Sequence, residues 1–389
     1  MVTVLRYLTA GESHGPCLTA IIEGIPSGLN ILKEGIDRAL ARRQQGYGRG
    51  GRMRIERDQV EILSGIRFGQ TLGSPITLQI RNKDWENWQE RMAAFGAPAG
   101  PEINQPRPGH ADLTGMLAYR RRDARDILER ASARETAARV AVGAIAQQLL
   151  AVFGVRIYGQ VINIGGIVSQ VRDLKDDCRQ KRMTESQLAC LDPAAEAKMI
   201  EAIDQAKRAG DTLGGTFEII AEGLPPGLGT HVQWDRKLDG RLAQALMSIQ
   251  GIKGVEVGLG LAYADHPGSR AHDEIFCSED RGYFRQTNRA GGIEGGYSNG
   301  EPIIVRAAMK PIPTLMKPLQ TVDTKTKQPV MASTERSDVC AVPAALVVGE
   351  AAVAITLADA LLERFGCYSM AETQENFKAY INYLHGEKP

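Results

Sequence analysis

The sequence of 389 residues has no uninterrupted run of 18 or more apolar residues, so we expect no membrane-spanning segment. Its first fifteen residues do not combine a charged stretch with an apolar one, which argues against a secretory signal. Its six cysteines form no C-x-x-C pair, so neither a zinc site nor a thioredoxin-like motif is indicated. Scattered thiols are typical of reduced cysteines, and we therefore expect a cytoplasmic protein without a bound metal.

The sequence also lacks the short motifs of several enzyme classes. It contains no G-x-x-x-x-G-K-[ST], no H-E-x-x-H and no G-x-S-x-G, which argues against a P-loop ATPase, a zinc protease and an α/β-hydrolase. The glycine-rich residues 46–51 follow an expected helix, whereas the dinucleotide-binding fingerprint follows a strand. His266 and His272 are six residues apart in an expected loop, which gives little support for a metal site.

The charge balance excludes one class of partner and suggests another. The chain carries 47 basic and 46 acidic residues, a formal net charge of +1, so a nonspecific nucleic-acid binder is not indicated. Of the basic residues, 33 are arginine and 14 are lysine. Arginine binds carboxylate and phosphate groups through paired hydrogen bonds. The excess suggests a site for a small anion, although biased codon usage would produce the same excess.

The order of the expected elements shows no regular βαβ repeat. We therefore predict an α+β fold with helices layered against antiparallel sheets. Residues 82–108 are rich in polar, proline and glycine residues and are expected to be irregular, whereas the charged residues 170–210 are expected to form a helical surface insertion. The predicted helices cover residues 32–45, 123–151, 235–249 and 343–365, and the predicted strands lie in VTVLRYLTA, LTAIIEGIPSGL, VEILSG, SPITLQI, RIYGQVINIGGIV, GGTFEIIAEG and GEPIIVRAA.

Two histidines lie in glycine-containing loops. His14 stands in GESHGP and His110 in RPGHADLTG, and glycine lets a backbone approach a ligand closely. Imidazole titrates near neutrality, so two such groups can divide acid and base duties. Each histidine alone is more simply an exposed loop residue.

Arg130 and Arg134 are four residues apart, so a helix over 123–151 would place them on one face. The apolar run that follows suggests that this part of the helix enters the core. A buried arginine needs a partner. Either a bound phosphate or carboxylate, or an internal salt bridge with a nearby carboxylate, would provide one.

Two later segments have loop patterns that suit a flat or anionic ligand. Residues 289–314 contain two Gly-Gly pairs and end in the stiff Lys310-Pro311-Ile312-Pro313-Thr314. Asp338 lies two residues after Arg336 and shortly before an apolar helix. It could act as a base beside the arginine, or it could cap that helix.

Taken in order, nine segments resemble the chorismate synthase family. They span residues 11 to 345, and residues 170–210 match none of them. The segments are GESHGP, RRQQGYGRGGRM, RPGHADLTG, ERASARETAARVA, GDTLGGTFEI, MSIQGIKGVEVGLG, NRAGGIEGGYSNGEPI, KPIPT and RSDVCAVPAA.

The resemblance implies one chorismate-synthase-like domain over residues 1–389 with a β-α-β sandwich core, assembled as a homotetramer. It implies a lyase that converts 5-enolpyruvylshikimate 3-phosphate to chorismate and phosphate, the last step of the shikimate pathway. This 1,4-anti elimination involves no net redox change but requires reduced FMN. Some members of the family also reduce the flavin with NADPH, and because no clear dinucleotide fold is present we favour a monofunctional enzyme.

The resemblance also implies roles for individual residues. His14 would protonate the leaving phosphate, His110 would support the protonation state of reduced flavin, and Asp338 would act through flavin N5. Gln250-Gly251 stands where many members have Asn-Ala, a change that we interpret as tolerated. The expected FMN contacts are Arg130, Ala131, Ser132, Gln250, Gly251, Gly295, Lys310, Pro311, Ile312, Pro313, Thr314 and Arg336; Arg43 and Arg49 match NADPH positions but could hold substrate; and Arg52, Arg107 and Arg134 would bind the substrate's anionic groups.

Overall fold

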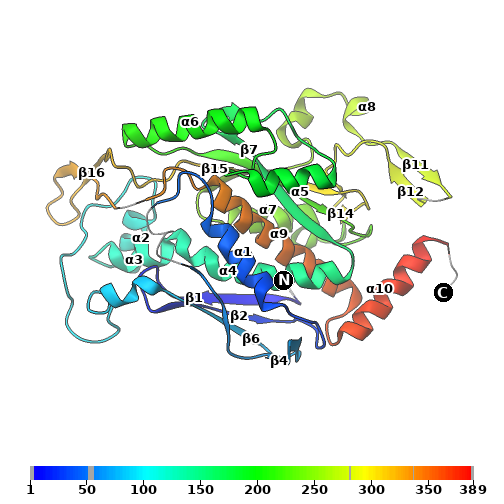
Figure 1. Cartoon of the computed structure of the whole chain (residues 1–389), viewed down its shortest axis with the longest axis horizontal. Coiled ribbons are helices and arrows are strands. Elements are labelled where there is room, and N and C mark those ends of the chain that lie inside the picture. Colours follow the sequence, from blue (N-terminus) through cyan, green and yellow to red (C-terminus); the bar gives the residue numbers. More distant parts are fainter. Residues whose placement is uncertain (1–3, 51–56, 280–281, 336, 387–389) are drawn as a thin grey trace.

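The computed structural model describes residues 4–50, 57–279, 282–335 and 337–386. A layer of helices lies between two antiparallel sheets (Figure 1), which confirms the predicted α+β class. One sheet has the order β1-β2-β6-β3 and the other β10-β15-β9-β7-β8. The strands are β1 Arg6–Ala10, β2 Cys17–Glu23, β3 Glu61–Ile62, β6 Ile76–Arg81, β7 Arg156–Ile164, β8 Ile167–Val168, β9 Gly215–Glu222, β10 Ile252–Val257 and β15 Ile303–Met309, and the central helices are α1 Lys33–Gln44, α4 Thr136–Val152, α7 Leu238–Met247 and α9 Val342–Phe365.

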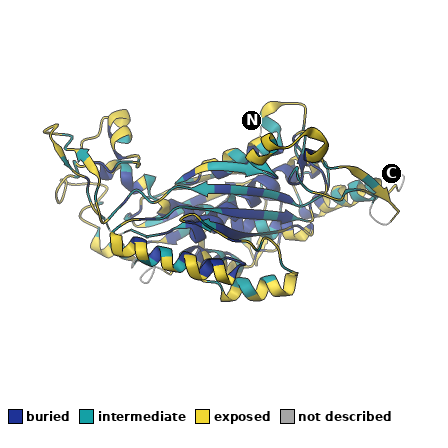
Figure 2. Ribbon diagram, turned by 90° about the horizontal axis from the view of Figure 1, so that it is seen from above, coloured by how far each residue is buried: buried dark blue, intermediate teal, exposed yellow. Residues whose placement is uncertain are grey.

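Alternation along the strands gives each sheet one face for the helices. In β2 the side chains of Leu18, Ala20 and Ile22 are buried, whereas Ile21 between them is exposed. Helix α4 contacts β2 and β6, and α9 contacts β7 and β9. The two apolar sheet faces are therefore buried against the same helical layer. Seen from above in Figure 2, the strands in the middle of the molecule are mostly buried or intermediate.

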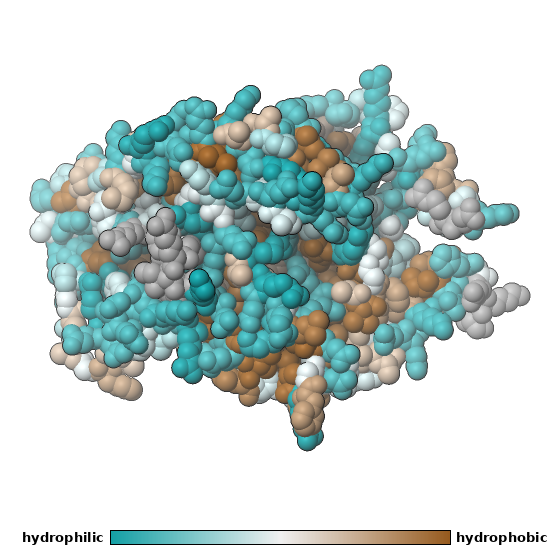
Figure 3. Space-filling view, in the orientation of Figure 1, coloured by the Kyte–Doolittle hydropathy of each residue, from teal (hydrophilic) through white to brown (hydrophobic). Residues whose placement is uncertain are grey.

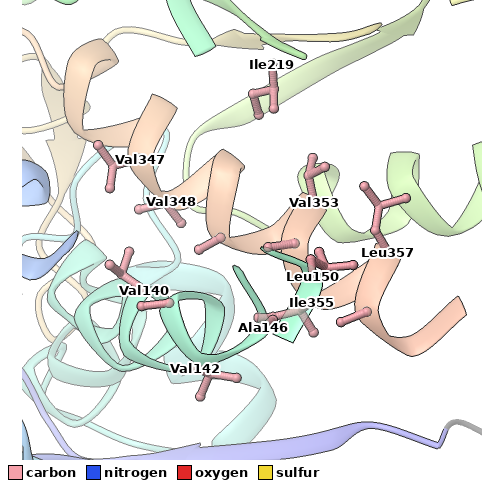
Figure 4. Close-up of a cluster of buried hydrophobic side chains, with 14 of the residues drawn as sticks. Val140, Val142, Ala146, Leu150, Ile219, Val347, Val348, Val353, Ile355 and Leu357 are labelled. Atoms are coloured by element: carbon pink, nitrogen blue, oxygen red, sulfur yellow. The ribbon is translucent and has the colours of Figure 1, made fainter. Parts of the chain in front are cut away.

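Helices α4 and α9 pack against each other through small and branched side chains (Figure 4). Gly143 of α4 faces Ala351 of α9, and a Cβ placed on Gly143 would lie 2.3 Å from the Cβ of Ala351. The missing side chain therefore lets the two helix backbones approach closely. Among the described residues, α9 is the one helix long and apolar enough to cross a membrane, but 89% of its apolar window is buried within the protein.

Shorter elements surround this sandwich. The hairpins β11–β12 and β16–β17 lie at opposite ends of the view in Figure 1, and α10 lies beside the C-terminus. The face in Figure 3 is largely hydrophilic, with hydrophobic patches in its lower half. These elements are β4 Ile66–Arg67, β5 Gln70–Thr71, η2 Lys83–Asn87, α2 Asp112–Tyr119, α3 Arg125–Ala131, η3 Ala133–Glu135, α5 Asp176–Glu185, α6 Pro193–Ala209, η4 Trp234–Arg236, η5 Gly260–Asp265, α8 Gly268–Ala271, β11 Ile275–Ser278, β12 Gly282–Arg285, β13 Ile293–Glu294, β14 Tyr297–Ser298, β16 Gln320–Val322, β17 Pro329–Met331 and α10 Met370–Leu384.

The single helix predicted over residues 123–151 is wrong. Helix α3 ends at Ala131, Ser132 is extended with φ −61° and ψ 142°, and the chain resumes as η3 and then α4. The reason is local, because the Ser132 hydroxyl accepts the backbone N–H of Arg134 at 3.3 Å and caps the next element. The break also means that Arg130 and Arg134 do not share one helix face.

Residues 170–210, expected as a surface insertion, form α5 and α6. Helix α5 contains no buried residue, whereas Met199 and Ile203 of α6 belong to the main hydrophobic core. The Tyr47 hydroxyl donates a hydrogen bond to Asp204 of α6 at 2.9 Å. One face of α6 therefore supports the glycine-rich loop that follows α1.

Candidate active site

His14 lies in the loop between β1 and β2, where Glu129 of α3 holds it. Both carboxylate oxygens of Glu129 lie 3.0 Å from the His14 Nδ1, and the His14 backbone N–H donates to the same carboxylate at 2.8 Å. The Glu129 side chain is only 2% exposed. Burial raises the pKa of Glu129, but hydrogen bonds and charge from His14 outweigh burial and hold that pKa below its usual value. The imidazole is therefore oriented with Nδ1 toward the carboxylate.

Trp88 and Arg125 complete the surroundings of His14. The imidazole stacks on Trp88, with ring centroids 4.0 Å apart and planes inclined by 28°. The Arg125 guanidinium lies 4.9 Å from the centre of the Trp88 ring and donates to Glu129 at 2.7 Å. Trp88 comes from residues 82–108, so the segment expected to be irregular supplies one wall of the site.

His110 is held in a similar way by Asp112, the first residue of α2. The His110 Nδ1 contacts Asp112 Oδ1 at 2.5 Å, and Arg107 Nε donates to Asp112 Oδ2 at 2.9 Å. Arg107 also donates to the Thr314 hydroxyl at 3.0 Å. Asp112 is fully buried. Burial opposes ionisation, but hydrogen bonds from His110 and Arg107 hold the pKa of Asp112 well below its usual range.

Glu335 lies between the two histidine loops. Its carboxylate is 3.7 Å from Arg107 Nη1 and 3.6 Å from Arg125 Nη2. Each of these arginines binds the carboxylate that holds a histidine, Asp112 for one and Glu129 for the other. The structure therefore brings the loops of His14 and His110 together, although they are distant in sequence.

Arg134 is buried and paired within the protein. Its Nη1 donates to Asp58 at 2.6 Å and its Nε to the Asn82 side chain at 2.9 Å. Of the two alternatives considered for this arginine, the structure contains the internal salt bridge. Asn82 also donates to the backbone carbonyl of Gly15 at 2.7 Å, so Arg134 is connected to the His14 loop.

Two further predicted arginines lie beside Arg134. Arg43 is buried and donates to the Thr136 hydroxyl at 2.9 Å, and Arg49 pairs with Asp338 at 3.0 Å. Burial, together with repulsion from Arg134 and Arg49, lowers the pKa of Arg43 to about 9. The Arg43 guanidinium therefore remains charged at neutral pH.

Among the described residues, the carboxylates of Asp58 and Asp338 contact these three guanidinium groups. Three guanidinium groups gathered in one place suit an anionic ligand. Asp338 also accepts the backbone N–H of Gly50 at 2.6 Å, whereas α9 has no side-chain cap. Of the two alternatives for Asp338, the position beside an arginine is therefore the one observed, and the partner is Arg49.

Several predicted FMN contacts lie near the His14 loop. Ser132 is 3.2 Å from the Ser13 hydroxyl, and Arg130 donates to the backbone carbonyl of Thr9 at 2.9 Å. Gln250 Nε2 donates to Glu135 at 3.1 Å, but its buried Oε1 has no hydrogen-bond partner among the described residues. A buried acceptor without a donor is costly, so a ligand N–H group would fit there. Ala131 directly precedes Ser132 at the end of α3.

The loop of residues 310–314 lies against the His110 loop. The Lys310 backbone N–H donates to the Gly251 carbonyl at 2.9 Å, and its ammonium group donates to the Gly109 carbonyl. Burial, with repulsion from Lys253, lowers the pKa of Lys310. Predicted cofactor residues from two segments therefore meet beside His110. These are Gly251 and the loop residues Lys310, Pro311, Ile312, Pro313 and Thr314.

One predicted residue, Gly295, does not join this group in the structure. Gly295 forms the turn of the β13–β14 hairpin, whose neighbours include Gly229 and Leu238. Arg52 and Arg336 lie outside the described residues. In the part of the chain that is described, no cluster of three or more metal-ligating side chains occurs.

A cavity of about 670 Å³ lies elsewhere, on the outer face of the five-stranded sheet. None of its lining residues is a predicted site residue. Several of its charged groups pair with each other, as in the 2.7 Å contact of Arg306 with Glu218 and the 2.6 Å contact of Arg179 with Asp173. We therefore place the candidate active site at the histidine loops, where the predicted histidines and arginines gather.

The carboxylates that organise the site were missed in the sequence. Glu129, Asp58 and Glu335 were not predicted as site residues, because His14, Arg134 and Arg107, which they contact, are distant from them in the chain. Asp112 could have been found, because it stands two residues after His110 at the start of a short helix. Trp88 had no recognisable motif.

The comparisons with known proteins agree with this geometry. A family model described as chorismate synthase matches residues 5–362. The chain is 59% identical over 390 residues to a chorismate synthase of Geobacter metallireducens, covering 98% of this chain and 99% of the relative. It is 58% identical over 383 residues to one of Brevibacillus brevis, covering 97% and 99%. A crystal structure of chorismate synthase, 46% identical, matches with a TM-score of 0.80 over 98% of both chains.

Proposed function

The chain belongs to the chorismate synthase family, and we propose that its reaction takes place between the His14 and His110 loops. Enzymes of this family are lyases that remove phosphate from 5-enolpyruvylshikimate 3-phosphate in the last step of the shikimate pathway. The observation that carries this location is the convergence of two carboxylate-held histidines beside the cluster of Arg43, Arg49 and Arg134. The substrate has one phosphate and two carboxylates, so a site with several guanidinium groups suits it.

The two histidines are proposed to act on different molecules, His14 on the substrate phosphate and His110 on the cofactor. His14 donates a proton to the phosphate oxygen as the C–O bond breaks, since its ring is held rigidly by Glu129 and Trp88. His110 sets the protonation state of the cofactor. Asp338, beside Arg49, is the carboxylate that would act through flavin N5.

The arginines are proposed to bind the substrate's anions and to stabilise the departing phosphate. Arg107 and Arg134 already lie in hydrogen-bonded frameworks, so their orientation changes little when an anion enters. Arg43 and Arg49 are assigned to the substrate rather than to NADPH, because they lie beside Arg134 in the same cluster. Arg52 is assigned with them, although it lies outside the described residues.

Members of the family require reduced flavin, and we propose that this chain binds FMN with the Gln250–Gly251 turn and the loop of residues 310–314. The residues present fit such a group, because the buried Gln250 Oε1 needs a donor and the Lys310 ammonium could contact an anionic ligand. Arg130, Ser132 and Arg336 are assigned to the same ligand. When bound, reduced flavin supplies a transient electron that weakens the C–O bond and a basic nitrogen for the C6 hydrogen.

The test is anaerobic chorismate formation from the purified protein, with FMN kept reduced by dithionite. We expect turnover in the wild type and a large loss in His14→Ala and His110→Ala while both variants stay folded. An absence of product from the folded wild type under these conditions would contradict the assignment. Wild-type turnover in either variant would remove the proposed role of that histidine.

Three further properties of the protein are proposed. We assign a monofunctional enzyme, which predicts no oxidation of NADPH in an aerobic assay with FMN. A homotetramer is proposed, which predicts a solution mass four times the 42.2 kDa of the chain in light scattering. The cytoplasm is the proposed location, and fractionation of the native host checks it.

A further inference from the structure

The two histidines have the same kind of support. In each case a buried carboxylate contacts Nδ1, and a buried arginine donates to that carboxylate. For His14 the pair is Glu129 and Arg125, with side chains 2% and 10% exposed. For His110 it is Asp112 and Arg107, with side chains 0% and 7% exposed. The same arrangement is therefore built twice, from different segments of the chain.

We propose that Glu129 and Asp112 are positioning residues that act through the histidines, each keeping the proton on Nδ1 and directing Nε2 toward the reacting molecules. The inference rests on the proposed roles of His14 and His110. A neutral imidazole carries one N–H, and the hydrogen bond at one nitrogen decides which nitrogen has it. A carboxylate is an acceptor only, so it selects the neutral form with hydrogen on Nδ1 and stabilises the imidazolium form, in which Nε2 also carries a hydrogen that His14 can donate. At His110 the Nη2 of Arg107 lies 3.2 Å from the same Nδ1, farther than Asp112 Oδ1 at 2.5 Å.

Arg125 and Arg107 strengthen the preference for hydrogen on Nδ1. Arg125 donates to Glu129 at 2.7 Å, and Arg107 donates to Asp112 at 2.9 Å. These contacts keep each carboxylate ionised and fix its plane. Glu335 lies within 3.7 Å of both arginines. It therefore connects the two carboxylate–arginine pairs, and replacing either arginine should affect the orientation of both histidines.

The central test is Glu129→Gln, which retains the shape but adds an amide N–H that can donate to Nδ1. The proton would then move to Nε2 in the neutral ring. We expect kcat to fall by about 10²-fold or more, with KM for the substrate changing by less than about threefold. In nitrogen NMR of ¹⁵N-histidine-labelled protein, the His14 signals should exchange their pyrrole-type and pyridine-type positions.

A double variant separates positioning from independent effects. Because Glu129 is proposed to act only through His14, His14→Ala combined with Glu129→Gln should be no slower than His14→Ala alone. If the fold-decrease in kcat of the double variant equals the product of the two single decreases, the proposal is overturned, because Glu129 would then act without the histidine. Unchanged kcat or unchanged His14 nitrogen signals in Glu129→Gln would also overturn it.

The matched control is Glu218→Gln. Glu218 is also buried and bound by an arginine, Arg306, but it lies on the outer face of the other sheet. Removal of this carboxylate charge in Glu218→Gln should lower thermal stability without a comparable fall in kcat. If His14→Ala is fully active, the proposed function of that histidine fails; if His14→Ala is inactive but Glu129→Gln is fully active, only the positioning role fails.

Discussion

Replacing Gly143 by alanine tests the packing of α4 on α9, the contact on which the helical layer depends. A Cβ at this position would lie 2.3 Å from the Cβ and 2.5 Å from the Cα of Ala351. Real Cβ atoms do not approach so closely, and one of the two atoms belongs to the backbone. The helices would therefore have to separate locally, because no flexible side-chain end can move away.

The magnitude follows from two opposing effects. Adding a methyl group to a filled core costs about 1–3 kcal/mol, and contact with backbone places Gly143→Ala at the upper end. Alanine in place of a glycine inside a helix restores about 1 kcal/mol. The expected net loss is about 2 kcal/mol. With an unfolding entropy of about 2.1 cal/mol/K per residue, this corresponds to a decrease in Tm of about 2–3 °C.

The assay is differential scanning calorimetry at a fixed protein concentration, with Gly240→Ala as the control. Gly240 also lies in a helix, α7, but the nearest heavy atom to its Cβ would be the Trp234 carbonyl oxygen at 3.9 Å. The Gly240→Ala variant should be more stable than the wild type by up to about 1 kcal/mol. A Tm of Gly143→Ala equal to or above that of the wild type would refute the reasoning.

Three further predictions follow from particular groups. The pKa of Asp112 is lowered in the folded protein, so its ionised carboxylate stabilises the fold fully above the unfolded pKa of about 4. This contribution to the free energy of unfolding is lost as pH falls through the folded pKa. Acid unfolding of Asp112→Asn, followed by fluorescence, should therefore depend less on pH than that of the wild type. Under native conditions a thiol reagent should react rapidly with the exposed Cys178 and Cys277 and slowly with Cys340, whose pKa burial raises to about 11; fast reaction of Cys340 would contradict its position. Inorganic phosphate at tenfold its Kd should stabilise the wild type by about 1.4 kcal/mol in thermal unfolding, and Arg134→Ala should lose this effect; an equal shift in both proteins would place the phosphate elsewhere.

The helices of the core could be located from sequence because apolar residues dominate them. The predicted segments 32–45 and 343–365 correspond closely to α1 and α9. The break at Ser132 was missed because the residues on both sides have helical patterns. Only the hydroxyl bonding to the Arg134 N–H decides that one helix stops and another begins.

By itself, the sequence determined the class of fold, the family and the identities of the two loop histidines, because hydrophobic periodicity and ordered motifs are local properties of the chain. The tertiary structure alone decided what surrounds each histidine. Glu129, Asp58 and Glu335 meet their partners across large sequence separations, and such pairs form only when packing of the two sheets and the helical layer brings their segments together. For the same reason Arg134, which suggested an anion site by its spacing, is held by an internal carboxylate in this structure.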